Sequence, residues 1–294
     1  MDALSHALIA YILFSTPGLS PLIPFVIVGA VIPDIDIFFS PVADLNPSLY
    51  LFTHGGVLHS IAGALVLSLV TYAVSVLLAA GAIIPAGIVS VTGIYGFAAI
   101  LAGALLHLAI DLPATPGIPV LAPFSNRQYS LNIFPGPSFL LAFAALGTAL
   151  VTLLRLLPFS SALLLFGSTV VAYIAVRAGM FLVADAALPG RKIPTINPLR
   201  WLVIRENEQS YAVQFHTFFS GLSEEAVFPK YKDTDDAEVT GSLEYPEVRR
   251  MVFSSYLVTA ERIGDVLILA DPLREKGFLY YPPKYKRVAV PAGK

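Results

Sequence analysis

Long apolar runs separated by short polar or Pro/Gly-containing breaks fill the first two thirds of the chain. Four of these runs have the length of a membrane span and cover residues 57–80, 88–111, 138–157 and 160–184. A helix of about 20 residues crosses a hydrocarbon core of roughly 30 Å. The pattern therefore predicts four transmembrane helices.

Two shorter apolar runs, 3–15 and 20–33, precede these four and are separated by Thr16, Pro17 and Gly18. They fit short spans, half-helices or a re-entrant hairpin. Irregular backbone is tolerated at membrane depth only where protein or a cavity covers it. We therefore expect these two short helices to form the wall of a site.

Charged residues are concentrated after residue 199. Residues 1–199 hold 5 of the 18 Lys and Arg and 6 of the 20 Asp and Glu, although the whole chain is 56% hydrophobic. This composition is typical of a membrane protein with a soluble extension. We predict an α-helical polytopic membrane protein with a helical metal-site domain at 1–190, a linker at 191–200 and a small soluble α+β domain at 201–294.

The soluble domain is recognised by its hydrophobic alternation. Residues 211–219, 265–271 and 288–290 predict strands of a small sheet, and 247–256 predicts a helix. The net charge of −2 excludes a nucleic-acid footprint, because no basic stripe is present. The absence of cysteine excludes disulfides and thiolate ligands.

Four of the five histidines lie within or beside the apolar runs of the first 111 residues, together with three aspartates. Ionisable side chains are costly at membrane depth, so their repeated occurrence there indicates a function. Histidine and aspartate together are typical metal ligands. The candidate ligands are His6, Asp34, Asp36, His54, His59, His107 and Asp111.

The direction of the chain brings these residues to one end of the helical bundle. The first two runs form an out-and-back pair that starts near His6 and ends near Asp34, and the next pair starts near His59 and ends near Asp111. Every polar residue of the set therefore lies at the same side. This prediction depends only on the number of crossings and not on the membrane orientation.

Local spacing also fits metal binding. His107 and Asp111 share one helix face, and Asp34 and Asp36 share one side of an expected extended segment. His54 and His59 flank two glycines, with His59 expected in the first helical turn. Seven N and O donors exceed the needs of one four-coordinate zinc. We predict two or three divalent ions, with zinc first and manganese or iron as alternatives.

These motifs, in this order and spacing, resemble the YdjM-type family of membrane-bound metal-dependent hydrolases over roughly residues 1–130. The family commonly has a basic residue where this chain has Gly55 and a threonine where it has Leu58, so a second-sphere role does not transfer to those two positions. The resemblance implies hydrolase activity. It is carried by Ser5-His6, Pro33-Asp34-Ile35-Asp36, His54 to Ser60, His107 to Asp111 and Thr115 to Pro119, and the junction of longer members by Asn197 to Trp201.

The chemistry expected is hydrolysis by metal-activated water at a phosphoester of a lipid or lipid-linked substrate. Residues 1–199 contain no glutamate, so Asp36 or Asp111 is the expected catalytic base or metal bridge. Arg127 lies in a polar loop and is the expected partner of an anionic head group or, equally, an interfacial anchor. Asp44 lies in a Pro/Asn-containing loop and is expected to be solvated.

Two other functions fit the same residues. A carrier could bind a cation among the histidines and carboxylates, although no inverted repeat is apparent. A scaffold could use the metal only for stability. The expected partners are the membrane, a lipid or lipid-linked small molecule and a second copy of the chain. Arg191, Lys192 and Arg200 favour a cell-membrane protein with a cytoplasmic C-terminal domain.

Overall fold

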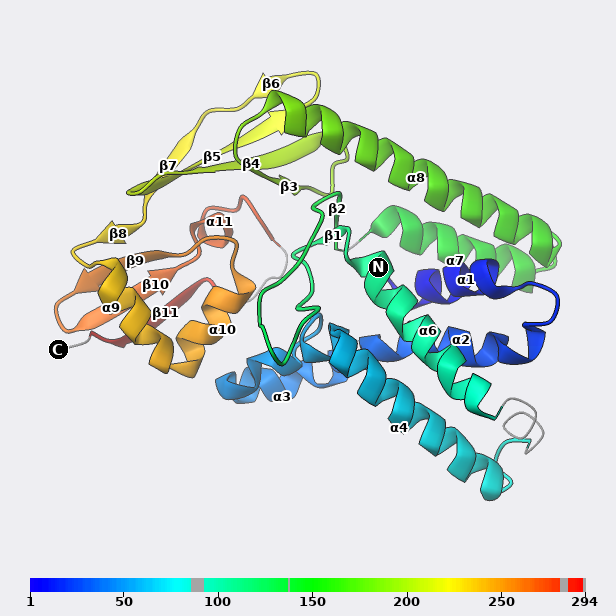
Figure 1. The fold of residues 1–294 in the computed structure, drawn as a ribbon. Helices are drawn as coiled ribbons and strands as arrows, with labels where there is room; N and C mark the ends of the chain where they lie inside the picture. Colours follow the sequence, from blue (N-terminus) through cyan, green and yellow to red (C-terminus); the bar gives the residue numbers. More distant parts are fainter. Residues whose placement is uncertain (86–92, 137, 281–284, 293–294) are drawn as a thin grey trace. The chain divides into compact units, whose positions relative to one another are not determined.

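The computed structural model describes residues 1–85, 93–136, 138–280 and 285–292, which form two compact units. The first unit contains Met1–Ser40 and Phe52–Gly179, and the second contains Pro41–Leu51 and Met180–Lys294. Figure 1 shows the helices of the first unit and the sheets of the second. The second unit is therefore built from two separate stretches of the chain.

The first unit is helical, as predicted. Among the described residues, four helical stretches are long and apolar enough to cross a membrane: Ser20–Leu45, Ile61–Ala80, Ile94–Asp111 and Phe159–Ala187. Two shorter apolar helices accompany them. Its helices are α1 (Ala3–Phe14), α2 (Ile23–Val31), α4 (Ile61–Ala80), α6 (Ile94–Asp111), α7 (Phe139–Leu153) and α8 (Phe159–Ala187, whose last turns belong to the second unit).

The lengths of two helices differ from the prediction. The short run 20–33 continues into the 26-residue stretch Ser20–Leu45, because Pro21 and Pro24 lie at helix starts, where proline is tolerated. The run 138–157 forms only the 15-residue α7, which ends before Arg155 with its positive φ of 56°. Residues 88–92 of the predicted span 88–111 lie outside the described residues, and α6 begins at Ile94.

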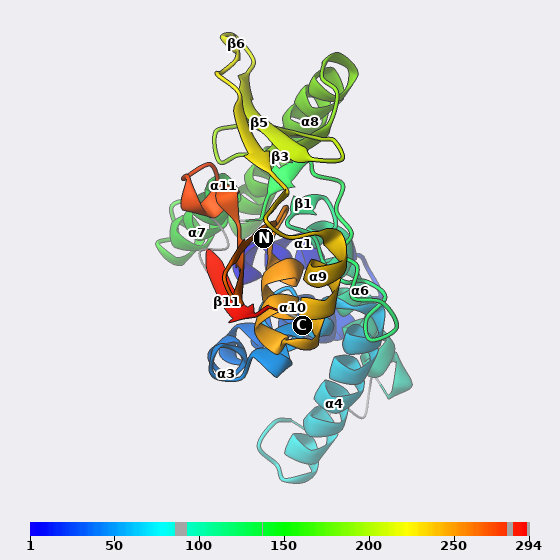
Figure 2. The ribbon, with the colours of Figure 1, turned by 90° about the vertical axis from the view of Figure 1, so that its left-hand side faces the viewer.

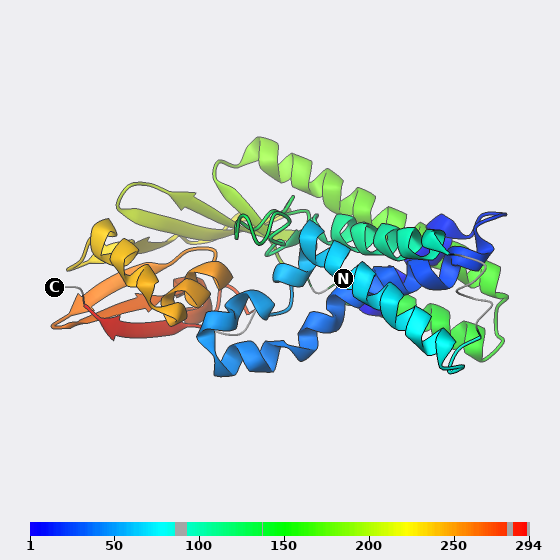
Figure 3. The ribbon, with the colours of Figure 1, turned by 60° about the horizontal axis from the view of Figure 1, so that its bottom comes forward.

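Large apolar side chains remain exposed along α4, among them Leu69 (60%) and Leu77 (70%). A contiguous apolar surface of this kind is rare on soluble proteins and is the surface that a bilayer covers. Within the unit, α2 contacts both α1 and α6, and α6 also contacts α4 (Figure 3).

Two glycines allow α2 and α6 to cross at backbone contact. A Cβ atom on Gly29 would lie 2.0 Å from the carbonyl oxygen of Ile100, and one on Gly103 would lie 2.1 Å from that of Val26. Small residues at such crossings are typical of membrane helices, because close packing replaces the hydrophobic effect there. The crossing brings the end of α2 beside the polar end of α6.

In its described residues, the C-terminal part of the second unit contains two sheets and the short helices α9, α10 and α11, in place of the single small sheet that the sequence indicated. One sheet has the order β3-β4-β5-β6 with β7 paired to β5, and the other has the order β11-β10-β9-β8. The bounds are β3 Arg191–Pro194, β4 Arg200–Glu206, β5 Ser210–Thr217, β6 Gly221–Leu222, β7 Ala226–Pro229, β8 Tyr231–Lys232, β9 Thr259–Ile263, β10 Val266–Ala270, β11 Arg287–Pro291, α9 Asp236–Gly241, α10 Pro246–Ser254 and α11 Pro272–Glu275.

The helix α10 agrees with the helix expected at 247–256, and its Val248 and Met251 belong to one core cluster with Leu267 and Leu269 of β10. Figure 2 shows α10 beside β11, which it contacts. Residues 191–200, expected as a linker, instead form β3 and the turn into β4. Lys192 in β3 is buried and forms an ion pair with Asp185, which explains why a basic residue occurs in a strand.

The segment between Asp36 and His54 also forms ordered structure. It contains α3 (Ser40–Leu45) and the 3₁₀ helix η3 (Pro47–Phe52), and most of it belongs to the second unit. Asp44 is exposed, as expected, and its Oδ1 accepts a hydrogen bond of 2.8 Å from the hydroxyl of Tyr285.

Candidate metal centre

The last turns of α6 supply two of the seven candidate ligands. His107 and Asp111 are both buried and lie one turn apart on the same face of the helix. Gly103 lies one further turn back on this face, so the residue that permits the crossing with α2 and the two polar residues follow one another at intervals of four. The packing of α6 therefore determines where His107 and Asp111 point.

The two aspartates that follow α2 lie in the 3₁₀ helix η2 (Ile32–Phe38) and not in an extended segment. A 3₁₀ helix turns about 120° per residue, so residues two apart point to different sides. Asp34 and Asp36 consequently approach His59 from different directions, Asp34 toward Nε2 and Asp36 toward Nδ1. The prediction that both point to the same side is wrong, although both reach the centre.

His59 is held just before α4. It ends the short 3₁₀ turn η4 (Val57–His59), one residue before the expected first helical turn. Ser60 is the N-cap of α4, and its hydroxyl accepts a 2.9 Å hydrogen bond from the Gly63 amide. The cap fixes the backbone next to His59, whose side chain is 1% exposed.

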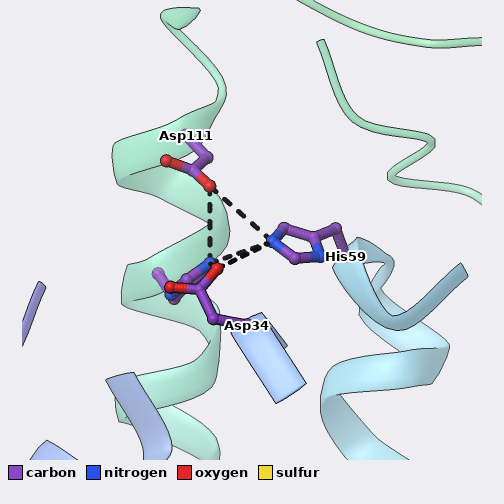
Figure 4. A group of neighbouring side chains, drawn as sticks. Asp34, His59 and Asp111 are labelled. Atoms are coloured by element: carbon purple, nitrogen blue, oxygen red, sulfur yellow. Dashed lines mark hydrogen bonds and ion pairs between the residues drawn. The ribbon is translucent and has the colours of Figure 1, made fainter. Parts of the chain in front are cut away.

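Four ligand atoms face a common point. Figure 4 shows Asp34, His59 and Asp111 directed toward one another, and His107 completes the group. His59 Nε2 lies 3.1 Å from His107 Nε2, 3.5 Å from Asp34 Oδ1 and 3.7 Å from Asp111 Oδ2. His107 Nε2 lies 3.5 Å from Asp34 Oδ1 and 3.4 Å from Asp111 Oδ2.

These separations fit one shared ion. Ligand atoms 2.0–2.2 Å from a tetrahedral ion lie roughly 3.3–3.6 Å apart, close to the observed range of 3.1–3.7 Å. Asp34 Oδ1 is buried and makes no hydrogen bond to any described residue, so it would otherwise be a costly buried acceptor. A divalent cation would satisfy it.

The hydrogen bonds of the histidines leave the correct nitrogen for a metal. His107 Nδ1 donates to the carbonyl oxygen of Ala30 at 2.7 Å, and His6 Nδ1 donates to that of Asp2 at 2.9 Å. A carbonyl oxygen only accepts, so the proton of each neutral ring is on Nδ1 and the lone pair of Nε2 faces inward. Metal-binding histidines are commonly oriented in this way.

His6 adds a fifth group beside the four. Its ring stacks on that of His107 with centroids 4.0 Å apart, and its Nε2 lies 3.3 Å from Asp111 Oδ1. This nitrogen is buried and makes no hydrogen bond within the described part of the chain. The amino group of Met1 lies 2.6 Å from the same oxygen of Asp111. The centre therefore extends to both oxygens of Asp111.

Asp36, His54 and His59 form a second group whose potential ligand atoms lie within 4.8 Å of one another. We describe Asp36 and His54 of this group as an outer layer. Asp36 Oδ1 accepts from His54 Nδ1 at 2.7 Å, and Asp36 Oδ2 accepts from the Gly55 amide at 3.0 Å and lies 2.8 Å from His59 Nδ1. The two contacts to imidazole nitrogens are shorter than the separation expected for ligands of one ion, and they have hydrogen-bond lengths. Burial opposes the charge on His59, but the adjacent Asp34 and Asp36 carboxylates raise its pKa to about 9.

Arg127 is placed differently from the other predicted residues. It is exposed, and its guanidinium lies over the ring of Tyr129 with 5.5 Å to the centroid. It does not belong to either group of potential metal ligands among the described residues. Its predicted contact with a substrate head group stays a prediction.

Several supporting positions were not identified from the sequence. The sequence does not mark the carbonyl oxygens of Asp2 and Ala30 as hydrogen-bond acceptors for histidines, because every residue has a backbone carbonyl. The spacing of small residues in the sequence does indicate the helix crossing, however. Ala99, Gly103 and His107 are spaced by four, which is a small-residue stripe leading directly to a ligand.

Substitution of Asp36 in the outer layer should weaken metal binding without abolishing it. Replacing Asp36 by asparagine removes the carboxylate that orients His59 but no atom of the four-atom group. We expect the dissociation constant for Zn²⁺ to increase by about 10- to 100-fold, which is the effect of losing an outer-shell partner. The stoichiometry at saturating Zn²⁺ should stay unchanged. Titration of the purified, metal-free protein with Zn²⁺ measures it, and Asp265→Asn, at an exposed turn, is the control. Complete loss of binding would instead place Asp36 among the direct ligands.

A family model described as YdjM inner membrane protein matches residues 1–184, which include all seven candidate ligands and, among the described helices, α1, α2, α4, α6, α7 and most of α8. No curated protein and no solved structure matches the chain.

Proposed function

Because this chain belongs to the YdjM inner membrane protein family, its chemistry takes place at a membrane, and we propose that it is a metal-dependent hydrolase acting on a phosphoester of a lipid or lipid-linked substrate. The observation that carries this proposal is the close grouping of ligand atoms of Asp34, His59, His107 and Asp111, all within 4.8 Å of one another, at the polar ends of apolar helices. The proposed ion is zinc, with manganese or iron as alternatives.

The ion would lower the pKa of water toward about 7 and draw charge from a phosphoryl oxygen. Asp34, His59 and His107, together with Asp111 Oδ2, would hold that ion. Asp36 accepts hydrogen bonds from His54 Nδ1 and the Gly55 amide and lies 2.8 Å from His59 Nδ1, so we assign it to orientation and not to proton transfer. Asp111 Oδ1 does not belong to the four-atom group but lies 3.3 Å from His6 Nε2 and 2.6 Å from the Met1 amino group, and we assign proton transfer to this oxygen.

The location of the centre supports a substrate with a lipid part. α4 begins just after His59, and α6 ends at Asp111, so the site lies where two apolar helices meet the polar part of the chain. A lipid head group at the bilayer surface would reach this level with its acyl chains in the membrane. Arg127, on the loop after α6, is the proposed contact for its negative charge.

Hydrolysis can be measured directly. Metal-loaded protein in vesicles should release phosphate or a head group from a lipid phosphomonoester or phosphodiester, and turnover should fall by more than about 10³-fold in Asp111→Asn, as expected for loss of a ligand that also transfers a proton. His216→Ala is the control, because His216 lies in β5 and outside both ligand groups.

Other outcomes have defined meanings. Stoichiometric metal without turnover of any lipid or water-soluble phosphoester contradicts the hydrolase and favours a scaffold. Metal-coupled flux across the vesicle membrane favours a carrier. The C-terminal domain is proposed to be cytoplasmic, and the reaction of a single introduced cysteine with a membrane-impermeant reagent tests that side, because the chain has no cysteine of its own.

A further inference from the structure

The chain leaves the first unit between two residues of the metal centre. Asp36 and His54 belong to the first unit, whereas Pro41–Leu51 between them belongs to the second. We call these eleven residues the 41–51 segment. The C-terminal domain is thus connected to the outer layer of the centre by the polypeptide itself, at both ends of this segment.

Ser40 forms hydrogen bonds with the residues that flank the 41–51 segment on both sides. Its hydroxyl oxygen accepts a 3.1 Å hydrogen bond from the His54 amide and donates at 3.5 Å to the carbonyl oxygen of Asp36. The backbone of both outer-layer residues therefore meets at the residue where the 41–51 segment begins. The 41–51 segment begins five residues after Asp36 and ends three residues before His54, so a displacement of that segment would be transmitted to both through a short stretch of backbone.

The far part of the segment is held by the C-terminal domain. Arg250 of α10 donates to the carbonyl oxygens of Ala43 at 3.2 Å and Asp44 at 3.4 Å. The same guanidinium lies over the Tyr285 ring, 4.1 Å from its centroid, and the Tyr285 hydroxyl donates to Asp44. The Tyr50 and Phe253 rings are in edge contact at 5.4 Å.

These contacts are directional and stay formed at neutral pH. Burial and the hydrogen bond to Asp44 raise the pKa of Tyr285 to about 12, so its hydroxyl keeps the proton that it donates. Arginine is charged at all relevant pH values and can reach two carbonyl oxygens at once. The domain therefore holds α3 through groups that do not titrate near neutrality.

We propose that Arg250 is a positioning residue for the metal centre: by holding the 41–51 segment on the C-terminal domain, it sets the geometry of the Asp36–His54 pair and, through Asp36, the orientation of His59. This inference rests on the metal site of the proposed function and does not depend on hydrolysis. It gives the C-terminal domain a task that the helical domain cannot perform alone, which is to adjust metal affinity.

The first test compares two neighbouring arginines of α10 in the full-length protein. Arg250→Ala should weaken Co²⁺ binding, followed by its visible absorption, by about 10-fold, the lower end of the effect of losing an outer-shell partner. Arg249 is exposed on the same helix, so Arg249→Ala should leave the affinity unchanged. Equal affinities of the Arg250→Ala and wild-type proteins would overturn the proposal.

A double-mutant cycle separates positioning from general destabilisation. If Arg250 acts through Asp36, Arg250→Ala should have little further effect on Co²⁺ affinity in an Asp36→Asn background. A purely structural loss would lower the affinity by the same factor in both backgrounds, and that additivity would overturn the proposal. Arg250→Lys keeps a donor for one carbonyl oxygen and should restore part of the affinity.

If Arg250→Ala does not fold, Tyr285→Phe decides the question, because it removes only the hydroxyl that contacts Asp44. It should weaken Co²⁺ binding in the wild-type background and not in the Asp36→Asn background. Failure of this inference also differs from failure of the proposed function. In the first case wild type and Arg250→Ala bind metal equally, and in the second a metal-loaded wild type hydrolyses no phosphoester.

Discussion

Replacing His107 by alanine is expected to abolish stoichiometric metal binding. The change removes one of four ligand atoms that lie within 4.8 Å of one another and leaves the carbonyl oxygen of Ala30 without its donor. The affinity should fall by more than the roughly 100-fold that marks the upper end for outer-shell partners. The metal content of the purified protein, measured by mass spectrometry after dialysis, is the readout.

The control for this variant is His216→Ala, which makes the same chemical change in strand β5. It should retain the metal content of the wild type. A His107→Ala protein that keeps its ion would show that the four-atom group is not the binding site. A protein that loses both ion and fold is distinguished by its helical content and by its thermal unfolding in detergent.

The second large effect is expected from a single added methyl group. In Gly103→Ala, the new Cβ would lie 2.1 Å from the carbonyl oxygen of Val26 and 2.7 Å from the amide nitrogen of Ala30, so α2 and α6 must separate. We expect the free energy of unfolding to fall by about 3 kcal/mol or more, the upper end of overpacking. Metal affinity should fall with it, because Ala30 orients His107.

The matched control is Gly147→Ala in α7, where an added Cβ meets nothing within 4 Å. The same substitution there should be neutral or stabilise the helix by up to about 1 kcal/mol, since alanine has the higher helix propensity. Thermal unfolding of both variants in one detergent measures the difference. Equal stabilities would mean that the two helices do not cross at Gly103.

The sequence predicted that the polar residues lie close together. It did not predict which of them belong to the four-atom group and which to the outer layer. Chain direction and apolar run lengths were sufficient to bring His6, Asp34, His59 and Asp111 to one end of the helices. The distinction between the four-atom group and the outer layer depends on differences of no more than about 1 Å between side-chain distances of 2.7–2.8 Å and 3.1–3.7 Å. No residue pattern contains that information, so Asp34 and Asp36 were indistinguishable before the structure.

One error in the sequence interpretation comes from local composition. The segment after Pro33 was expected to be extended, because proline is typical of loops. The structure has 3₁₀ and α-helical turns there, held by Ser40 and by Tyr285. Tyr285 is 241 residues away from Asp44 along the chain, and local composition contains no information about such a partner.

One face of α6 carries both the closest helix crossing and two metal-centre residues. Gly103 tolerates no larger side chain, and His107 and Asp111 tolerate no different chemistry, so this stripe has little freedom to vary. The opposite side is different, with Ile94 70% exposed and Leu105 41% exposed. Adaptation of this helix to bilayers of other thickness or lipid composition would consequently be confined to its outward side, and could proceed there without disturbing the chemistry within.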